Sequence, residues 1–140
     1  MQQEEEMAEN KTFFLEVVTP NRVFFKGDCE MLELSTIEGD IGIYPEHVST
    51  TCILVPGTMK IHQNGEIKKA ALHTGFIEIL RDRVTVLAEA AEWPGEINIK
   101  RAEEARKRAE ERLARRESSL DVARAELALK RAVARINALK

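Results

Sequence analysis

The chain has 140 residues, of which 44% are apolar and 32% charged, and its formal net charge at pH 7 is −3. This length suits one ordinary domain or a smaller domain with an appendage, and the composition predicts a soluble, ordered protein rather than a disordered one. No stretch approaches the roughly 18 apolar residues that a membrane-spanning helix needs. The acidic start MQQEEEMAEN lacks the segments of a secretory signal, and we expect residues 1–10 to form a flexible tail.

Residues 12–92 are predicted to form short strands separated by turns, without intervening helices. The strand-like runs are TFFLEVVTP, NRVFFKGD with a turn at residues 27–28, CEMLELSTIEGD ending at residues 39–40, and VSTTCILVPG. They are followed by TMKIHQNGEIKKAALH, in which Asn64-Gly65 is a strong hairpin signal, and by GFIEILRDRVTVLAEAAE. Short strands at this spacing indicate an antiparallel β-sandwich or a flattened barrel.

This strand region contains no pattern typical of a catalytic or metal site. Cys29 and Cys52 lie in strand-like runs without Cys-x-x-Cys spacing, and we expect buried thiols that are neither bridged nor bound to metal. His47, His62 and His73 fall in different runs, and none has metal-ligand spacing to a cysteine or a second histidine. A nucleophile elbow, a Gly-rich phosphate loop and HExxH are also absent from the sequence. We therefore expect a protein that is not itself an enzyme.

From Asn98 onward the apolar residues follow a helical period, and we expect two helices that form an antiparallel hairpin. Asn98 can cap the first helix, ESSLD supplies a turn, and Ser119 is the expected cap of the second helix. The hairpin has few large apolar residues, so it should be only marginally stable and able either to lie on the sandwich or to leave it. The two apolar stripes consist of Ala102, Ala105, Ala109 and Leu113, and of Val122, Ala125, Leu129, Val133 and Ile136.

The charge of the chain is unevenly distributed. Residues 98–140 carry 13 Lys and Arg against 7 Asp and Glu, a net charge of +6, whereas residues 1–97 carry −9. The cations alternate with glutamates, as in RAEEARKRAEERLARRE, and no aromatic residue follows Trp93 to stack on bases. A nucleic-acid adapter with a basic helical arm is therefore the weakest interpretation.

The arginines of both helices recur at the spacing of one helix face. They are Arg101, Arg108 and Arg112 on the first helix, and Arg124, Arg131 and Arg135 on the second. Two interpretations stay open at this point. The charges are either solvated and relieved by glutamates of the facing helix, or they meet around a polyphosphate, whose oxygens suit guanidinium groups. The same choice applies to Asn98 and Arg101, which are either a cap with a solvated charge or half of a small-molecule site.

Four stretches, in order, resemble one known family, the epsilon subunit of bacterial F-type ATP synthase (delta in mitochondria). LEVVTPNRVFF resembles its opening strand and turn, and HTGFIEI with RVTVLAEAAE resembles its last strands. RAELALKRAVARI resembles its second C-terminal helix, and the resemblance covers essentially the whole chain after the first ten residues. The most specific stretch is EGDIGIYPEHVSTT, whose pattern is carried by Gly39, Gly42, Ile43, Tyr44, Pro45 and His47.

The resemblance implies an α+β fold: a ten-stranded antiparallel β-sandwich over residues 11–93, followed by a two-helix hairpin over residues 94–140. It implies a non-catalytic rotor subunit that binds the gamma subunit and rests on the c-ring, coupling proton flow to ATP synthesis. Asp40, with Gly39 and Gly42, would contact the c-ring. The basic hairpin would extend toward the alpha/beta catalytic head and inhibit ATP hydrolysis. The expected location is peripheral, at the cytoplasmic face of the bacterial plasma membrane, without membrane insertion and without nucleic acid.

In several bacterial members the folded hairpin binds ATP through an Ile-Asp-x-x-Arg-Ala motif, and this gives a second functional hypothesis. The chain would then be an ATP-sensing module whose hairpin closes on the nucleotide, with no cofactor otherwise required. It departs from the motif at Asn98, which keeps the capping oxygen but lacks the charge of aspartate. The matching positions are Glu92, Ile97, Asn98, Arg101, Ala102, Arg108, Arg131 and Arg135.

Overall fold

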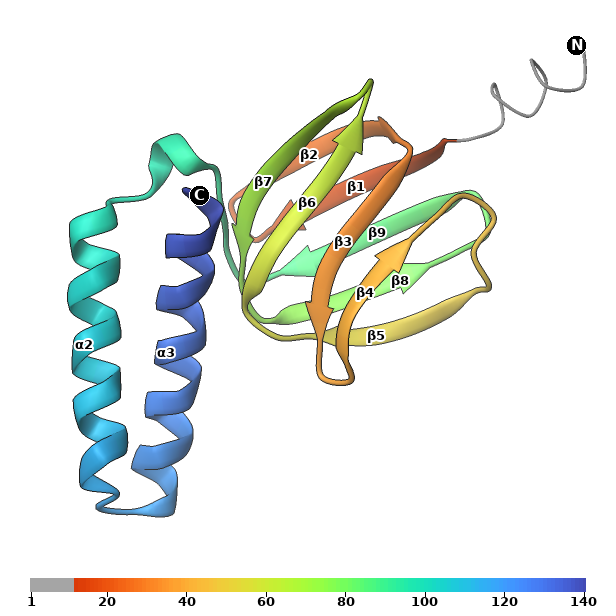
Figure 1. Ribbon diagram of the computed structural model, residues 1–140. Helices are drawn as coiled ribbons and strands as arrows, with labels where there is room; N and C mark the ends of the chain where they lie inside the picture. The colour runs from red at the N-terminus through yellow and green to blue at the C-terminus, as the bar shows by residue number, and fades with distance from the viewer. Residues whose placement is uncertain (1–11) are drawn as a thin grey trace, which may run out of the picture.

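The computed structural model describes residues 12–140, so the tail expected at residues 1–10 lies outside the described residues. Ten strands are followed by a short 3₁₀ turn and two helices (Figure 1). We keep residues 11–93 and 94–140 as the proposed domains. The elements are β1 (Phe13–Thr19), β2 (Arg22–Cys29), β3 (Met31–Thr36), β4 (Gly39–Ile43), β5 (Thr50–Leu54), β6 (Gly57–Gln63), β7 (Glu66–Leu72), β8 (Gly75–Ile79), β9 (Arg83–Ala88), β10 (Ala91–Glu92), η1 (Pro94–Glu96), α2 (Ile99–Arg115) and α3 (Ser119–Ala138).

The strands form one hydrogen-bonded sheet that folds back on itself as a sandwich. The strand order is β10-β7-β6-β3-β5-β8-β9-β1-β2, with β4 paired to β3. A single pair of residues, Thr36 and Leu54, joins β3 to β5, and there the sheet turns from one layer into the other. The alternation seen in the sequence places Leu15, Leu32 and Ile61 in the core between the layers. The ten-stranded sandwich and the helical hairpin are as expected.

The sheet is antiparallel except for one pair of strands. β1 runs antiparallel to β2 but parallel to β9, from Phe14 opposite Arg83 to Val18 opposite Leu87. Consecutive strands joined by tight turns must be antiparallel, and that is the pattern the sequence predicts. β1 and β9 are far apart in sequence and meet only when the sheet closes, so turn signals carry no information about their direction.

Two of the turns expected from the sequence are misplaced. Residues 27–28 lie inside β2, because Gly27 pairs with Leu15 and Asp28 with Phe14 in a long β1–β2 ladder. Residues 39–40 open β4 rather than ending a strand, since Ser35 pairs with Asp40 and Thr36 with Gly39. The Asn64-Gly65 turn is where the sequence predicts it, with the positive φ of both residues, 53° and 78°, that suits a tight hairpin.

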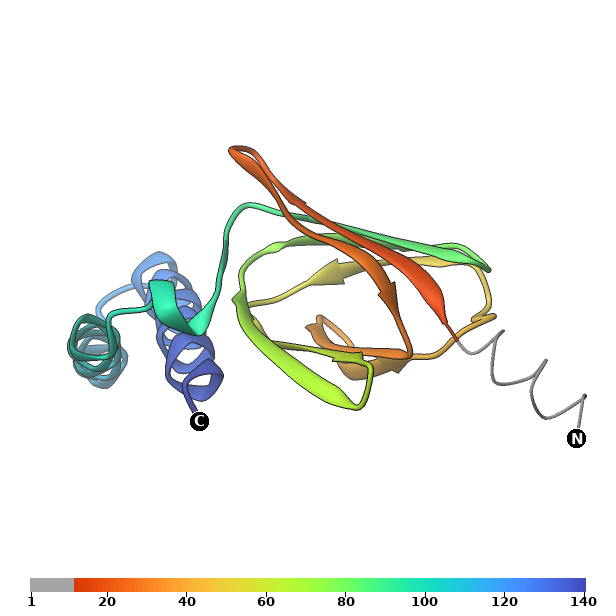
Figure 2. The same ribbon diagram turned by 90° about the horizontal axis from the view of Figure 1, so that it is seen from above.

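The two helices meet through alanines. Ala102 and Ala109 of α2 are buried, as are Ala125 and Ala132 of α3, so the helices approach closely over small side chains. Val133, expected in the α3 stripe, is instead 37% exposed, because the alanines before and after it take the buried positions. In Figure 2 the hairpin lies at one end of the sandwich. Within residues 12–140, neither helix is long and apolar enough to cross a membrane.

Two further expectations change in detail. The cap of α3 is Ser118, whose Oγ accepts a hydrogen bond from the Asp121 N–H at 3.1 Å, and Ser119 is the first helical residue. Both cysteines are free thiols, but only Cys29 is buried, and Cys52 is half-buried. Burial, reinforced by the charges of Glu30 and Asp28, raises the pKa of the Cys29 thiol to about 12, so it stays protonated at neutral pH.

Candidate functional site

A cavity of about 490 Å³ lies at the junction of the linker, α2 and α3. It contains six of the eight residues that the resemblance proposed for ATP, although they come from β10, the start of α2 and the end of α3. Ile97 and Arg131 are not among the lining residues. The cavity is lined by Glu92, Glu96, Asn98, Arg101, Ala102, Glu104, Ala105, Arg108 and Arg135.

Asn98 is the cap of α2, as predicted. Its backbone is extended, and its Oδ1 accepts a hydrogen bond from the Arg101 N–H at 3.1 Å. This bond satisfies one of the four backbone donors that every helix start leaves without an intrahelical partner. Asn98 also lines the cavity, so one residue both caps α2 and belongs to the candidate site.

The two arginines of the α3 face bind the sandwich. A terminal nitrogen of Arg131 lies 2.7 Å from Oε1 of Glu89, and Nε of Arg135 lies 2.8 Å from Oε1 of Glu92. These carboxylates relieve the repulsion between arginines four residues apart, a role that the sequence suggested for glutamates of the facing helix. No sequence pattern indicates Glu89, since it lies in the loop between β9 and β10 and approaches Arg131 only through the fold.

Ile97 and Arg131 therefore have structural contacts in this conformation. Ile97 packs against a small apolar cluster of Ala71 from β7 with Ala134 and Ala138 from α3, and this cluster attaches α3 to the sandwich. The Thr58 hydroxyl adds a 3.3 Å hydrogen bond to the Ala134 carbonyl. The hairpin is thus held by a few alanines, one hydroxyl and two ion pairs.

The linker between the domains is anchored to the sandwich. The Trp93 ring stacks on Phe24 with centroids 4.1 Å apart. A terminal nitrogen of Arg22 donates to Oε1 of Glu96 at 2.8 Å, and the same oxygen accepts from the Trp93 N–H at 2.9 Å. The hydrogen bond from Arg22, followed by that from the Trp93 amide, lowers the pKa of Glu96. The anchored segment therefore runs through Trp93 to Glu96 and is followed by Ile97 and the α2 cap, Asn98.

His73, at the end of β7, is a member of this junction that the sequence did not reveal. It is 1% exposed, and its Nε2 lies 2.8 Å from the same Glu92 oxygen that accepts from Arg135. Burial first, and then the nearby Arg135, lower the pKa of His73, so the ring is neutral at pH 7 and Nε2–H donates to the carboxylate. Partial burial alone would raise the pKa of Glu92, but the hydrogen bonds from His73 and Arg135 outweigh it and lower this pKa.

The remaining arginines of the predicted faces lie elsewhere. Arg112 and Arg124 line a separate hollow of about 330 Å³ at the turn between the helices, together with Arg115, Glu117 and Asp121. Helical spacing places residues on one face but cannot say which end of the face a cavity occupies. Arg101 and Arg108 make no ion pair within residues 12–140, which leaves both guanidinium groups free to bind an anion in the cavity.

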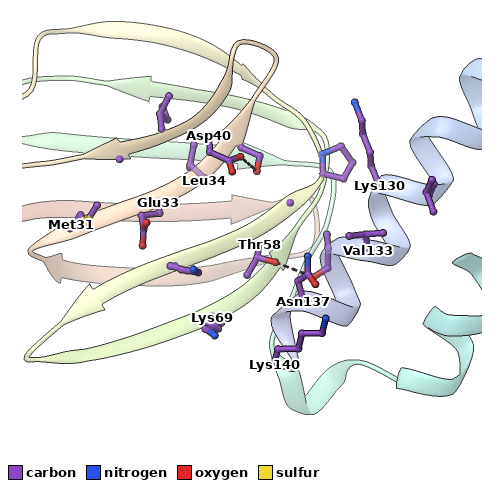
Figure 3. Close-up of a pocket in the computed structure, with 18 of the residues that line it drawn as sticks. Met31, Glu33, Leu34, Asp40, Thr58, Lys69, Lys130, Val133, Asn137 and Lys140 are labelled. Atoms are coloured by element: carbon purple, nitrogen blue, oxygen red, sulfur yellow. Dashed lines mark hydrogen bonds between the residues drawn. The ribbon is translucent and has the colours of Figure 1, made fainter.

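The residues expected to contact the c-ring lie on and beside the β3–β4 hairpin. Asp40 accepts a 2.6 Å hydrogen bond from the Ser35 hydroxyl, and with Gly42 it lines a cleft of about 860 Å³ between the outer face of β3, β4 and β6 and the end of α3 (Figure 3). Gly39 is exposed, with a φ of 118° that favours glycine. A Cβ on Gly42 would lie 2.9 Å from Cε of Met31, so a larger residue there would push against this cleft.

Two domain models of one protein family together match residues 12–140. Residues 12–107 match "ATP synthase, Delta/Epsilon chain, beta-sandwich domain", and residues 96–140 match "ATP synthase, Delta/Epsilon chain, long alpha-helix domain". An ATP synthase epsilon chain from Caldanaerobacter subterraneus subsp. tengcongensis is 48% identical over 128 residues, covering 91% of this chain and 93% of that one. One from Clostridium novyi is 47% identical over 127 residues, covering 90% and 96%.

Two solved structures have a similar fold at low sequence identity. A chain in the Euglena gracilis mitochondrial ATP synthase (OSCP/F1/c-ring) superposes with a TM-score of 0.80 at 18% identity, covering 93% of this chain and 82% of that one. A chain in the central stalk and c-ring of the Tetrahymena thermophila mitochondrial enzyme gives 0.61 at 12% identity, covering 91% and 96%.

The capping role of Asn98 can be tested separately from any ligand. Asn98→Ala removes the acceptor for the Arg101 N–H and should destabilise the first turn of α2 by about 1 kcal/mol. Amide hydrogen exchange at Arg101 should therefore become about fivefold faster. Asn98→Asp keeps the acceptor and should leave that exchange unchanged or slower; equal acceleration in both variants would contradict the cap.

Proposed function

The chain belongs to the delta/epsilon family of ATP synthase chains, and we propose that it is a rotor-stalk subunit that couples c-ring rotation to ATP synthesis and restrains ATP hydrolysis. The epsilon chain is a non-catalytic subunit of ATP synthase. The observation that carries the proposal is the contrast between a continuous ten-stranded sandwich and a basic hairpin attached by few contacts. The sandwich is the rigid coupling element, and the hairpin is the regulatory arm.

The gamma subunit is proposed to bind the outer face of the β5–β8–β9 layer. Cross-strand pairing places Ile53, Phe76 and Leu87 in one row, with exposed fractions of 55%, 48% and 39%. Figure 2 shows the helices at one end of the sandwich, and at that end Ile53 lines a hollow together with Ala123 and Leu127 of α3. A contiguous row of large exposed apolar residues is typical of a protein–protein interface. The opposite layer is more polar on its outer face, where Lys60 pairs with Lys69 and Glu33.

Two further surfaces are assigned to the other partners. Asp40 and Gly39, in the β3–β4 hairpin, are proposed to contact the c-ring, with Gly42 keeping the adjacent surface open. The hairpin, with its net charge of +6, is proposed to reach the alpha/beta catalytic head once it leaves the sandwich. These contacts correspond to a peripheral position at the cytoplasmic face of the bacterial plasma membrane.

The proposed gamma surface is tested by Phe76→Glu. A charge in the middle of the apolar row should weaken binding to the isolated gamma subunit at least tenfold, because it would be buried there without a partner. Ile67→Glu is the matched control, since Ile67 is 52% exposed on β7 of the other layer. Surface plasmon resonance with both folded variants measures the difference, and equal affinities would rule out this face.

The inhibitory arm is tested by deleting residues 98–140 within the assembled complex. ATP hydrolysis should rise at least severalfold, while binding to gamma and proton pumping per ATP should remain, because the sandwich and its apolar row are retained. Hydrolysis and ATP-driven proton pumping are measured on the same membranes. Unchanged hydrolysis with a fully incorporated truncated subunit means that this hairpin is not inhibitory.

A second function, ATP sensing by the closed hairpin, is proposed from the 490 Å³ cavity. Arg101 and Arg108 are two turns apart on α2 and form no ion pair within residues 12–140, so they can bind phosphate oxygens. Arg135 shares the wall but is engaged by Glu92, and Arg131 acts at a distance by holding α3 against Glu89. A bound nucleotide would bridge α2 to the end of α3 and so favour the closed hairpin.

Calorimetry of the chain with MgATP tests this site. We expect measurable binding that Arg108→Ala weakens at least tenfold, because one guanidinium group is lost from the cavity. Arg112→Ala is the matched control, since Arg112 lies one turn further along α2 and lines the other hollow. Asn98→Asp restores the residue of the family motif and should strengthen binding. An absence of heat at millimolar MgATP in both the parent chain and Asn98→Asp would eliminate the site.

A further inference from the structure

The junction between sandwich and hairpin contains a histidine that neither proposed function requires. His73 immediately follows β7, lies close to Arg131 and Arg135 of α3, and is 1% exposed. Its Nε2–H donates to Glu92, while its Nδ1 is buried and has no hydrogen-bond partner among residues 12–140. A buried titratable ring with one unsatisfied nitrogen is sensitive to any movement of the atoms that cover it.

The hairpin controls the charges around this ring. The groups that face it are Glu92 on β10 and Arg131 and Arg135 on α3, and Arg131 is itself held by Glu89. Glu92 uses a single oxygen, Oε1, to accept from both His73 and Arg135. While the hairpin is closed, the Glu92 carboxylate accepts from Arg135 as well as from His73. The His73 ring then lies near two arginines, Arg131 and Arg135. When the hairpin leaves, both cations leave with it, and Glu92 is left to His73.

A proton on His73 is therefore poorly tolerated only in the closed state. Protonating Nδ1 there would create a buried N–H without an acceptor and a cation next to two guanidinium groups. In the open state the ring gains access to water, and the Glu92 carboxylate can stabilise an imidazolium. Closure of the hairpin and protonation of the ring are mutually unfavourable, so each must weaken the other by the same factor.

We propose that His73 is a proton-binding switch that links the position of the hairpin to pH, with protonation of the ring favouring release of the hairpin from the sandwich. This inference rests on the proposed mobility of the hairpin, but not on its inhibitory role or on ATP binding. Acidification opens the arm, and a neutral or alkaline medium keeps it closed.

The direction of the pH effect follows from the difference in the pKa of His73 between the closed and the open hairpin. In the closed state burial and the charges of Arg135 and Arg131 outweigh the opposing hydrogen bond to Glu92, and they hold the pKa of His73 below its ordinary value of 6.5. Release removes these influences and raises it. As the pH falls below about 6.5, the open state binds a proton that the closed state does not, so the ratio of open to closed chains rises by up to tenfold per pH unit. The pKa of Glu92 is already below 4.5 and is reached only at more acid pH.

Fluorescence energy transfer in the full-length chain tests the switch. Dyes are attached to cysteines at the exposed positions Glu66 on β7 and Lys107 on α2, with Cys29 and Cys52 replaced by alanine. Between pH 8 and pH 5.5 the fraction with a long dye-to-dye distance should rise severalfold or more. In His73→Gln, which keeps an N–H donor for Glu92 but cannot gain a proton, this rise should disappear.

A matched control is available on the same sandwich. His62 also binds a carboxylate, with Nε2 2.7 Å from Oε2 of Glu33, but neither residue forms an ion pair with the hairpin. His62→Gln should keep the full pH dependence of the parent chain. The proposal is overturned if His73→Gln opens with pH as the parent does, or if no opening occurs between pH 8 and pH 5.5.

Imidazole titration by NMR gives an answer that does not depend on the His73 variant. In the double variant Arg131→Gln, Arg135→Gln, His73 should titrate at higher pH than in the parent. An unchanged His73 titration would contradict the coupling. The inhibitory role and the pH switch can fail separately. If deleting the hairpin relieves inhibition but the hairpin does not respond to pH, only the switch is wrong. If the hairpin responds to pH but does not inhibit hydrolysis, only the inhibitory role is wrong.

Discussion

The junction of the two domains depends on one carboxylate oxygen. Oε1 of Glu92 accepts a hydrogen bond from His73 of the sandwich and another from Arg135 of the hairpin, at 2.8 Å each. Glu92 is at the last strand position before the linker, so the residue that ends the sandwich also binds the end of α3. Partly buried, the carboxylate would be costly without these donors, and with them it stays ionised. The closed conformation thus depends on a polar contact that can be broken and remade, rather than on a large apolar interface.

The apolar part of the same interface is small because of the residue types involved. Ala71, Ala134 and Ala138, with Ile97 beside them, place little apolar area between α3 and the sheet, whereas the sandwich core contains leucines, isoleucines and phenylalanines. At about 25 cal/mol per Å² of apolar area, such an interface contributes far less than the core does. Alanine therefore serves both interfaces of the hairpin: it allows close approach of α2 and α3, and it leaves only a small apolar contact between α3 and the sandwich.

The sequence predicts the elements that depend on local chemistry and misses contacts between distant segments. Asn64-Gly65 and Asn98 were predicted correctly, because a tight turn and a helix cap each depend on the residue itself. The parallel pairing of β1 with β9 and the ion pair of Arg131 with Glu89 join residues far apart in the chain, which periodicity cannot detect. Of the eight site residues proposed from the resemblance, six line the cavity; Asn98, Arg101, Arg108 and Arg135 were also indicated by capping and helical spacing, whereas Glu92 and Ala102 came from the resemblance alone. His73 was missed because its role comes from what α3 places over it.

Asn98 and Glu92 together determine how a nucleotide would have to bind. In the closed hairpin Arg135 is committed to Glu92, and Glu96 to Arg22, which leaves Arg101 and Arg108 with Glu104 as the unpaired charges of the cavity wall. Relative to the aspartate of the family motif, asparagine at position 98 keeps the oxygen that caps α2 but loses the negative charge. The same change removes a charged acceptor for hydroxyl or amino groups of a ligand. The lost acceptor weakens recognition of such groups, and a nucleotide bound by Arg101 and Arg108 would close the hairpin without displacing Arg135 from Glu92.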